Sequence, residues 1–181
     1  MEELERLIRA YRMLASSSVA SKLDVLMDFV RICDPGLVPF LLMVMGDRHE
    51  LEEVRIHVLK ELRNGHGLVV PANRPRVAKA IGDVLADESA ADLRLQAALA
   101  LGEFARIDGV LARLSTVCLA QEESIDLRYA AFTSLERAGP TPECIALLRQ
   151  VSNDDTLGSA ARSVLLAWHV EYPLRVQKET P

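Results

Sequence analysis

Residues that could do chemistry are few in this chain, and their spacing indicates no catalytic constellation. His49 and Glu50 are adjacent, but a single His–Glu pair supplies too few ligands for a metal site. We interpret this pair as a helix start, where the helix dipole favours an acid. The other histidines, His57, His66 and His169, share no metal-ligand spacing. With no local nucleophile motif either, we predict no catalytic residue, no metal and no cofactor.

Two stretches contain residue types that bind phosphates or other anions. The segment Gly65-His66-Gly67 lacks the preceding strand and the GxGxxG spacing of a dinucleotide site, so we expect a flexible connection there. Arg74, Arg76 and Lys79 form the best local candidate for binding an anion. These charges lie at a helix start, however, where the dipole disfavours cations.

The most regular feature of the sequence is a helical pattern that recurs along the chain, most clearly in residues 92–105. There Leu93, Ala97, Leu101 and Phe104 recur at steps of three and four, which places them on one stripe of a helix. A basic residue follows the first apolar residue of the stripe. Its counterparts along the chain are Lys22, Arg55, Arg94, Arg128 and Arg162. Their separations of 33, 39, 34 and 34 residues indicate a repeated two-helix unit.

Apolar periodicity, glycine and proline stops and N-cap residues together predict an all-α chain. We expect ten helices in five antiparallel pairs, over residues 1–15, 19–32, 37–45, 49–63, 75–86, 90–105, 108–120, 124–138, 143–151 and 156–170. The longest break is 64–73, which contains two glycines and a proline. We predict a single domain over 1–172 and a flexible tail over 173–181.

Composition and charge narrow the possible partners. The chain has 181 residues, half of them hydrophobic but only 4% aromatic, so it can bury a sizeable core made mostly of Leu, Val and Ala. The net charge of −5 is concentrated in residues 87–181. This acidic half makes nucleic acid an unlikely ligand, because a phosphate backbone requires a continuous basic stripe.

The sequence also favours a protein of the cytoplasm. The longest apolar run, 37–45, is far shorter than the roughly 20 residues needed to span a bilayer, so we expect no membrane partner. The start of the chain carries charges where a signal peptide needs an apolar run. Cys33, Cys118 and Cys144 are odd in number and widely spaced, and we interpret them as buried free thiols in a reducing compartment.

Taken together, these features resemble HEAT repeats, and most closely the HEAT-like repeats of the phycobilisome-lyase type. Each matching unit has a first helix, a turn with an acid, and a second helix with the pattern (V/L)R…A…AL. The clearest matches lie at 47–62, 87–102, 127–135 and 154–162. The resemblance covers about residues 20–170 and implies a right-handed α–α superhelix, an armadillo-like solenoid. Tetratricopeptide repeats have a similar period, but their early Trp-Leu-Gly-Tyr pattern is missing here.

The resemblance also implies roles for the acids and arginines of the pattern. In the family these residues pair within or between repeats, and an arginine that is partly buried needs such a partner. The residues expected in this structural ladder are Asp47, Arg55, Asp87, Arg94, Arg128, Asp155 and Arg162. The third turn departs from the pattern, because Gln121-Glu122-Glu123 stands where the Asp is expected, so this rung uses a Glu or is missing.

In HEAT-like solenoids the second helices line a concave surface, and such surfaces bind partners. By this resemblance the surface would carry His57, Lys60, Glu61, Asn64, Gln96, Leu99, Ala100, Glu103, Ala130, Thr133, Ser134 and Arg137. It would be mixed in charge with small apolar residues at its centre. Such a surface suits a peptide or helix of another protein, so we expect a non-enzymatic scaffold or adaptor.

Three alternatives remain open. The chain could hold a ligand or chromophore, as the similar bilin lyases do, although no cysteine or aromatic cluster marks a pocket. It could bind nucleic acid, as HEAT-fold DNA glycosylases do, although the corresponding face is not basic. It could also form a homo-oligomer through its ends, with helix 37–45 or the Trp168 end covered by a second copy. Otherwise we expect Trp168, which lies in the last helix, to cover the hydrophobic end of the solenoid.

Overall fold

The computed structural model describes residues 2–14, 18–32, 34–65, 67–87 and 90–170. Within these residues the protein is all-α, as predicted, and no strand occurs. The α-helices are α1 (Glu2–Met13), α2 (Val19–Ile32), α3 (Val38–Gly46), α4 (Glu52–Asn64), α5 (Arg74–Leu85), α6 (Ala91–Leu101), α7 (Val110–Leu119), α8 (Ile125–Ala138), α9 (Pro142–Val151) and α10 (Gly158–Ala167). Three short 3₁₀ helices are η1 (Pro35–Leu37), η2 (Pro71–Asn73) and η3 (Gly102–Phe104).

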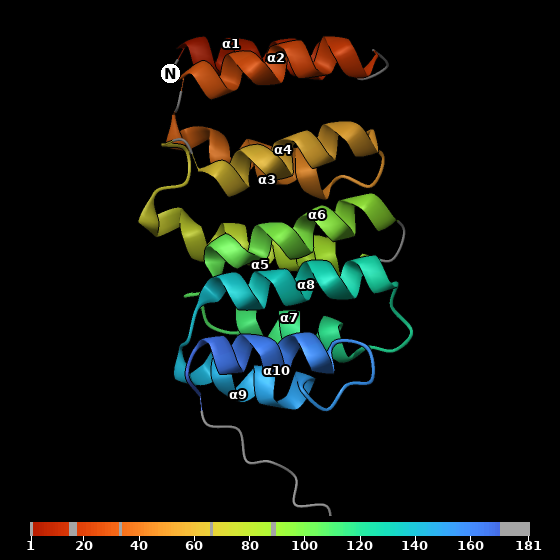
Figure 1. Cartoon of the computed structure of the whole chain (residues 1–181). Helices are drawn as coiled ribbons and strands as arrows, with labels where there is room; N and C mark the ends of the chain where they lie inside the picture. Colours follow the sequence, from red (N-terminus) through yellow and green to blue (C-terminus); the bar gives the residue numbers. More distant parts are fainter. Residues whose placement is uncertain (1, 15–17, 33, 66, 88–89, 171–181) are drawn as a thin grey trace, which may run out of the picture.

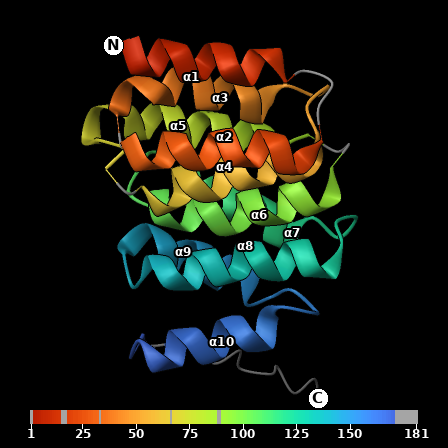
Figure 2. The ribbon, with the colours of Figure 1, turned by 90° about the horizontal axis from the view of Figure 1, so that it is seen from above.

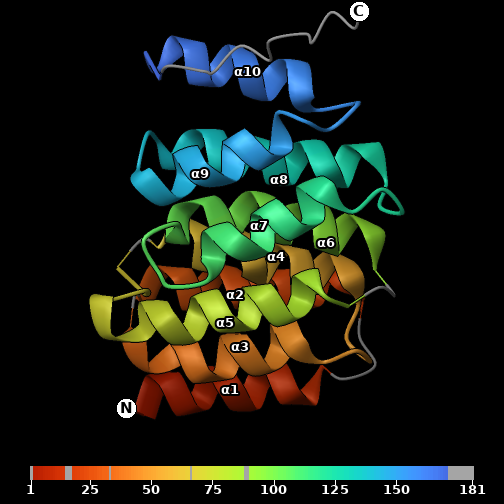
Figure 3. The same cartoon turned by 90° about the horizontal axis from the view of Figure 1, so that it is seen from below.

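The helices lie in two layers (Figure 1). Each odd-numbered helix packs against the even-numbered helix that follows it. Helices α2, α4, α6 and α8 also pack in order against one another, and so do α3, α5, α7 and α9. We call these rows the second-helix layer and the first-helix layer. Helix α1 packs on α2 at one end, and α10 packs on α9 at the other (Figures 2 and 3).

The core between the layers is built from the predicted apolar stripes. Leu93, Ala97, Leu101 and Phe104 are all buried, because the steps of three and four turn them toward the first-helix layer. Near the start of the chain three aromatic rings pack together: the ring centroid of Phe40 lies 5.5 Å from that of Tyr11 and 5.3 Å from that of Phe29. The small alanines of α6 and α8, several of them fully buried, allow these two helices to pack closely.

Helix boundaries follow local capping chemistry. Ser124 is the N-cap of α8, and its hydroxyl accepts the Leu127 N–H. Thr141 is the N-cap of α9, and its hydroxyl accepts the Cys144 N–H. Helix α4 starts at Glu52 instead of the predicted His49, because Leu51 is extended and serves as the N-cap. Its predecessor α3 ends in a turn in which Asp47 accepts the His49 N–H.

The 64–73 connection is more closely packed than a flexible linker. The α4 helix is capped by Gly65, which has a φ of 75°, a conformation that favours glycine. Leu68 is fully buried in the core, and its N–H bonds to the Gly65 carbonyl at 2.6 Å. The helix η2 then leads directly into α5. Leu68 therefore anchors the part of this connection that the structure describes.

Candidate functional site

A repeated set of polar contacts links the turns of the protein. In three repeats the arginine Nε of a second helix donates to a carbonyl at or just after the end of the preceding helix. These pairs are Arg55 with Met45 O, Arg94 with Leu85 O and Arg128 with Cys118 O, each at 2.8 Å. Arg162 makes the equivalent contact through Nη1, with Ser152 O at 2.5 Å. The arginine thus ties together the two helices of its own repeat.

The same basic side chains also reach an acid in the turn of the next repeat. The pairs are Lys22–Glu50 at 2.6 Å, Arg55–Asp87 at 3.7 Å, Arg94–Glu123 through two contacts, and Arg128–Asp154 at 2.6 Å. Because each pair crosses from one repeat to the next, these contacts fix the register of the whole array. We call the four pairs the base–acid ladder.

Two acids of the ladder differ from the expected ones. Glu50 takes the place expected for Asp47, because the Asp47 carboxylate is exposed and closes its own turn at the His49 N–H. Asp154 takes the place expected for Asp155, which is exposed. Asp154 Oδ1 accepts the N–H groups of the turn at Thr156 and Leu157, which directs Oδ2 toward Arg128. The third turn supplies Glu123.

The structure also overturns the interpretation of Glu50 as a simple helix-start acid. Glu50 lies two residues before α4, and its carboxylate accepts hydrogen bonds from Lys22 Nζ, the Leu51 N–H and the Tyr11 hydroxyl. Burial alone would raise its pKa, but these three hydrogen bonds and the Lys22 charge hold the pKa below its ordinary value. His49 beside it is exposed.

Asp154 has a similar electrostatic environment at the other end of the ladder. Burial works to raise its pKa, and hydrogen bonds from the Leu157 and Thr156 N–H groups and from Gln121, together with the Arg128 charge, lower it overall. Both acids are therefore ionised at neutral pH and matched by a buried cation. Removing only one member of either pair would therefore leave a buried charge without its partner, which is costly.

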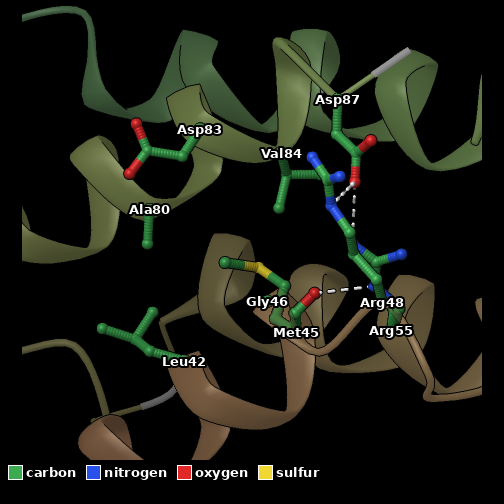
Figure 4. Close-up of a pocket in the computed structure, with 9 residues that line it drawn as sticks. All are labelled: Leu42, Met45, Gly46, Arg48, Arg55, Ala80, Asp83, Val84 and Asp87. Atoms are coloured by element: carbon green, nitrogen blue, oxygen red, sulfur yellow. Dashed lines mark hydrogen bonds and ion pairs between the residues drawn. The ribbon is translucent and has the colours of Figure 1, made fainter. Parts of the chain in front are cut away.

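A cleft of about 300 Å³ opens beside one rung of the ladder, between α3 and α5 (Figure 4). Its walls are apolar, and its charged end contains Asp87, which pairs with Arg48 at 3.2 Å and with Arg55. Asp83 on the opposite side pairs with Lys79 at 2.8 Å. Both carboxylates that line the cleft are therefore already paired with cations.

The predicted anion candidate is divided among separate contacts. The Arg74 guanidinium lies over the Phe104 ring, 4.7 Å from its centroid, and donates to the Glu103 carbonyl. Lys79 pairs with Asp83 one turn further along α5. Arg76 is exposed. These three cations therefore do not converge on one site.

The expected partner-binding residues separate into two groups. The first group is exposed or half-buried on the second-helix layer and consists of His57, Lys60, Glu61, Asn64, Gln96, Leu99, Glu103, Thr133 and Arg137. Ala100, Ala130 and Ser134 are buried instead, because α6 and α8 pack closely at their small side chains. The Ser134 hydroxyl donates to the Ala98 carbonyl at 2.8 Å. We call the first group the second-helix face.

Two features of the second-helix face were not evident from residue types. Arg137 pairs with Glu103 at 2.6 Å, so a half-exposed ion pair joins neighbouring repeats on this face. The His57 Nε2 is buried without a hydrogen-bond partner in the described structure. Both features depend on how neighbouring helices are aligned, which only the three-dimensional structure shows.

Other candidate chemistry is limited in the described ranges. They contain no group of three or more His, Cys, Asp or Glu side chains that could hold a metal ion. Cys118 and Cys144 are buried free thiols, as predicted, whereas Cys33 lies outside the described residues, as does His66. No described helix is both long and apolar enough to cross a membrane.

Trp168, at the C-terminal end of α10, is half-buried and packs against the core.

In comparisons with known proteins, no family model matches the chain and no curated protein matches it.

Proposed function

We propose that this protein is a HEAT-like solenoid, a right-handed superhelix of five antiparallel helix pairs, and that it acts as a non-enzymatic protein-binding scaffold in the cytoplasm. Its partner would bind on the second-helix face, which forms the concave side of the superhelix. The partner would be a peptide or helix of another protein.

The observation that carries this proposal is the regularity of the base–acid ladder. Four successive junctions use a base at the same helical position and an acid from the following turn. A constant register of this kind aligns equivalent residues of α4, α6 and α8 into one continuous surface, and extended surfaces are how repeat proteins bind partners.

The chemistry of the second-helix face supports a protein partner. Three further residues, the exposed acids Glu53, Asp92 and Asp126, extend this face at the start of α4, α6 and α8. Half-buried apolar side chains, Ile56 and Leu95, follow them in register. Protein interfaces combine apolar centres with polar rims in this way.

Affinity capture from a lysate of the source cells would test the proposal with two variants. Lys60→Glu/Thr133→Glu changes the charge of the second-helix face at two accessible positions. Glu103→Arg/Arg137→Glu reverses the exposed ion pair while keeping its attraction. The wild-type protein should retain a partner that both variants lose, with unchanged helical content by circular dichroism.

Arg76→Glu is the matched control, because Arg76 is exposed on α5 in the first-helix layer. It should retain the partner. Equal retention by all variants would place the interface elsewhere, and capture of a small molecule or nucleic acid instead of a protein would reject the scaffold function.

A further inference from the structure

Among the described residues, the last base at the ladder position, Arg162, forms no ion pair. Lys22, Arg55, Arg94 and Arg128 each reach an acid of the following repeat, and their side chains are largely buried. Arg162 occupies the same position in α10 and keeps the carbonyl contact to Ser152. It is exposed, however, and forms no ion pair within the described structure.

The apolar position one turn after Arg162 is uncovered as well. Leu166 is 66% exposed. Its counterparts in the other repeats, Leu26, Leu59, Ala98 and Phe132, are all buried. The α10 end of the described array thus presents a cation that is largely buried in the other repeats and an apolar side chain that they bury fully.

The opposite end presents an unmatched acid. Ser134 of α8 donates to the Ala98 carbonyl of α6, which shows that this position faces the preceding second helix. Ala130, one turn earlier, is buried on the same side. The equivalent residues of α2 are Asp28 and Asp24, both exposed, since no second helix precedes α2 in the described chain. Within the described residues Asp24 forms no ion pair, whereas Asp28 pairs with Arg31 at 3.0 Å.

From these two ends we infer that copies of this protein associate head to tail, with α10 of one copy packing beside α2 of the next. In this arrangement Arg162 pairs with Asp24 of the second copy, and Leu166 packs near the exposed Met27. The contact is heterologous, so it produces open chains of copies instead of a closed dimer. This inference does not depend on the proposed partner on the second-helix face.

Sedimentation velocity of the full-length protein over a range of concentrations tests the inference. The average mass should rise with concentration without reaching a plateau. Arg162→Glu alone and Asp24→Arg/Asp28→Arg alone should each weaken association by about tenfold or more, because like charges would then face each other. Leu166→Ser should weaken it through loss of apolar contact.

Mixing the two charge variants provides the sharpest test, because only folded variants can recover association in the mixture. An equimolar mixture of Arg162→Glu with Asp24→Arg/Asp28→Arg restores opposite charges at every contact, so association should return to near the wild-type level. Arg76→Glu, away from both ends, should associate as the wild type does. A wild-type protein that stays monomeric at all concentrations overturns the inference, as do variants that associate normally or a mixture that fails to recover.

Discussion

Arg128 of α8 and Asp154 of the α9–α10 turn form the most enclosed ion pair of the ladder, with 2.6 Å between Nη2 and Oδ2 and side chains only 4% and 1% exposed. Arg137 of α8 and Glu103 of η3 form a second pair of the same length, with side chains 45% and 41% exposed. Both pairs join neighbouring repeats. They differ in burial, which makes them a matched test of what the ladder contributes.

Arg128→Leu should lower the free energy of unfolding by about 3–5 kcal/mol, because it leaves the Asp154 carboxylate buried without its cation. Arg137→Leu should lower the free energy of unfolding by less than about 1 kcal/mol, because its ion pair with Glu103 is exposed to solvent. Urea unfolding followed by circular dichroism measures both. Equal effects would show that burial of the ladder does not determine its contribution.

The double variant Arg128→Leu/Asp154→Asn should recover part of the loss. Asparagine removes the buried charge, and its side-chain oxygen can still accept the Thr156 and Leu157 N–H groups that Asp154 accepts. A double variant no more stable than Arg128→Leu would indicate that the arginine acts through its packing and its Cys118 carbonyl contact instead of through the ion pair.

Gly102→Ala should destabilise the α6–α8 contact by about 1–3 kcal/mol, since an added Cβ has to displace a packed neighbour. That atom would lie 3.2 Å from Ser134 Cβ and 3.3 Å from its Cα, a backbone atom that cannot rotate away. Gly46→Ala, at the end of α3, is the control, because nothing lies within 4 Å of its Cβ position. Comparing the two melting temperatures checks this prediction, and similar values would contradict it.

Glu50 should make unfolding sensitive to acid. Its pKa in the folded protein lies below the ordinary value of 4.5, so between these two values the unfolded state binds more protons. The stabilisation is therefore complete above about pH 4.5 and is lost as the pH falls through the folded pKa. Glu50→Gln should make the free energy of unfolding depend less on pH in the acid range. It should also lower this free energy at neutral pH, because Lys22 loses its charged partner.

Urea unfolding of Glu50→Gln at pH values from about 3 to 7 measures this slope. Glu53→Gln is the control, because Glu53 is exposed and pairs with no base in the described chain. Its curve should parallel that of the wild type. A wild-type slope in Glu50→Gln would show that other carboxylates control acid unfolding.

The helices and the ladder bases could be predicted from sequence because both depend on local, periodic signals. Apolar patterns and stop signals predicted the ten α-helices of the described chain but not the three 3₁₀ helices, and the recurring base located Arg55, Arg94 and Arg128. The acids were harder to assign. Asp47 and Glu50 lie three residues apart in one turn, and only the folded turn directs Glu50 toward Lys22.

Contacts between repeats could not be predicted from the sequence for the same reason. Nothing in the sequence near Tyr11 indicates that its hydroxyl reaches Glu50, 39 residues away, at 2.7 Å. Ala100 and Ser134 have residue types typical of a surface as well as of a tight interface, and only the α6–α8 packing shows that they are buried. Local pattern thus predicts elements, whereas side-chain partners depend on the spacing of helices.

Cys118 and Cys144 should resist thiol reagents until the protein unfolds. Burial raises the pKa of Cys118 to about 12 and that of Cys144 to about 11, so neither forms the reactive thiolate near pH 8. In a Cys33→Ser background, we expect no labelling by a chromogenic disulfide reagent in native buffer and two thiols labelled in urea. Labelling of the native protein at a rate independent of urea would contradict the burial of both thiols between α7, α8 and α9. A rate that follows the urea unfolding curve would instead report opening of these helices.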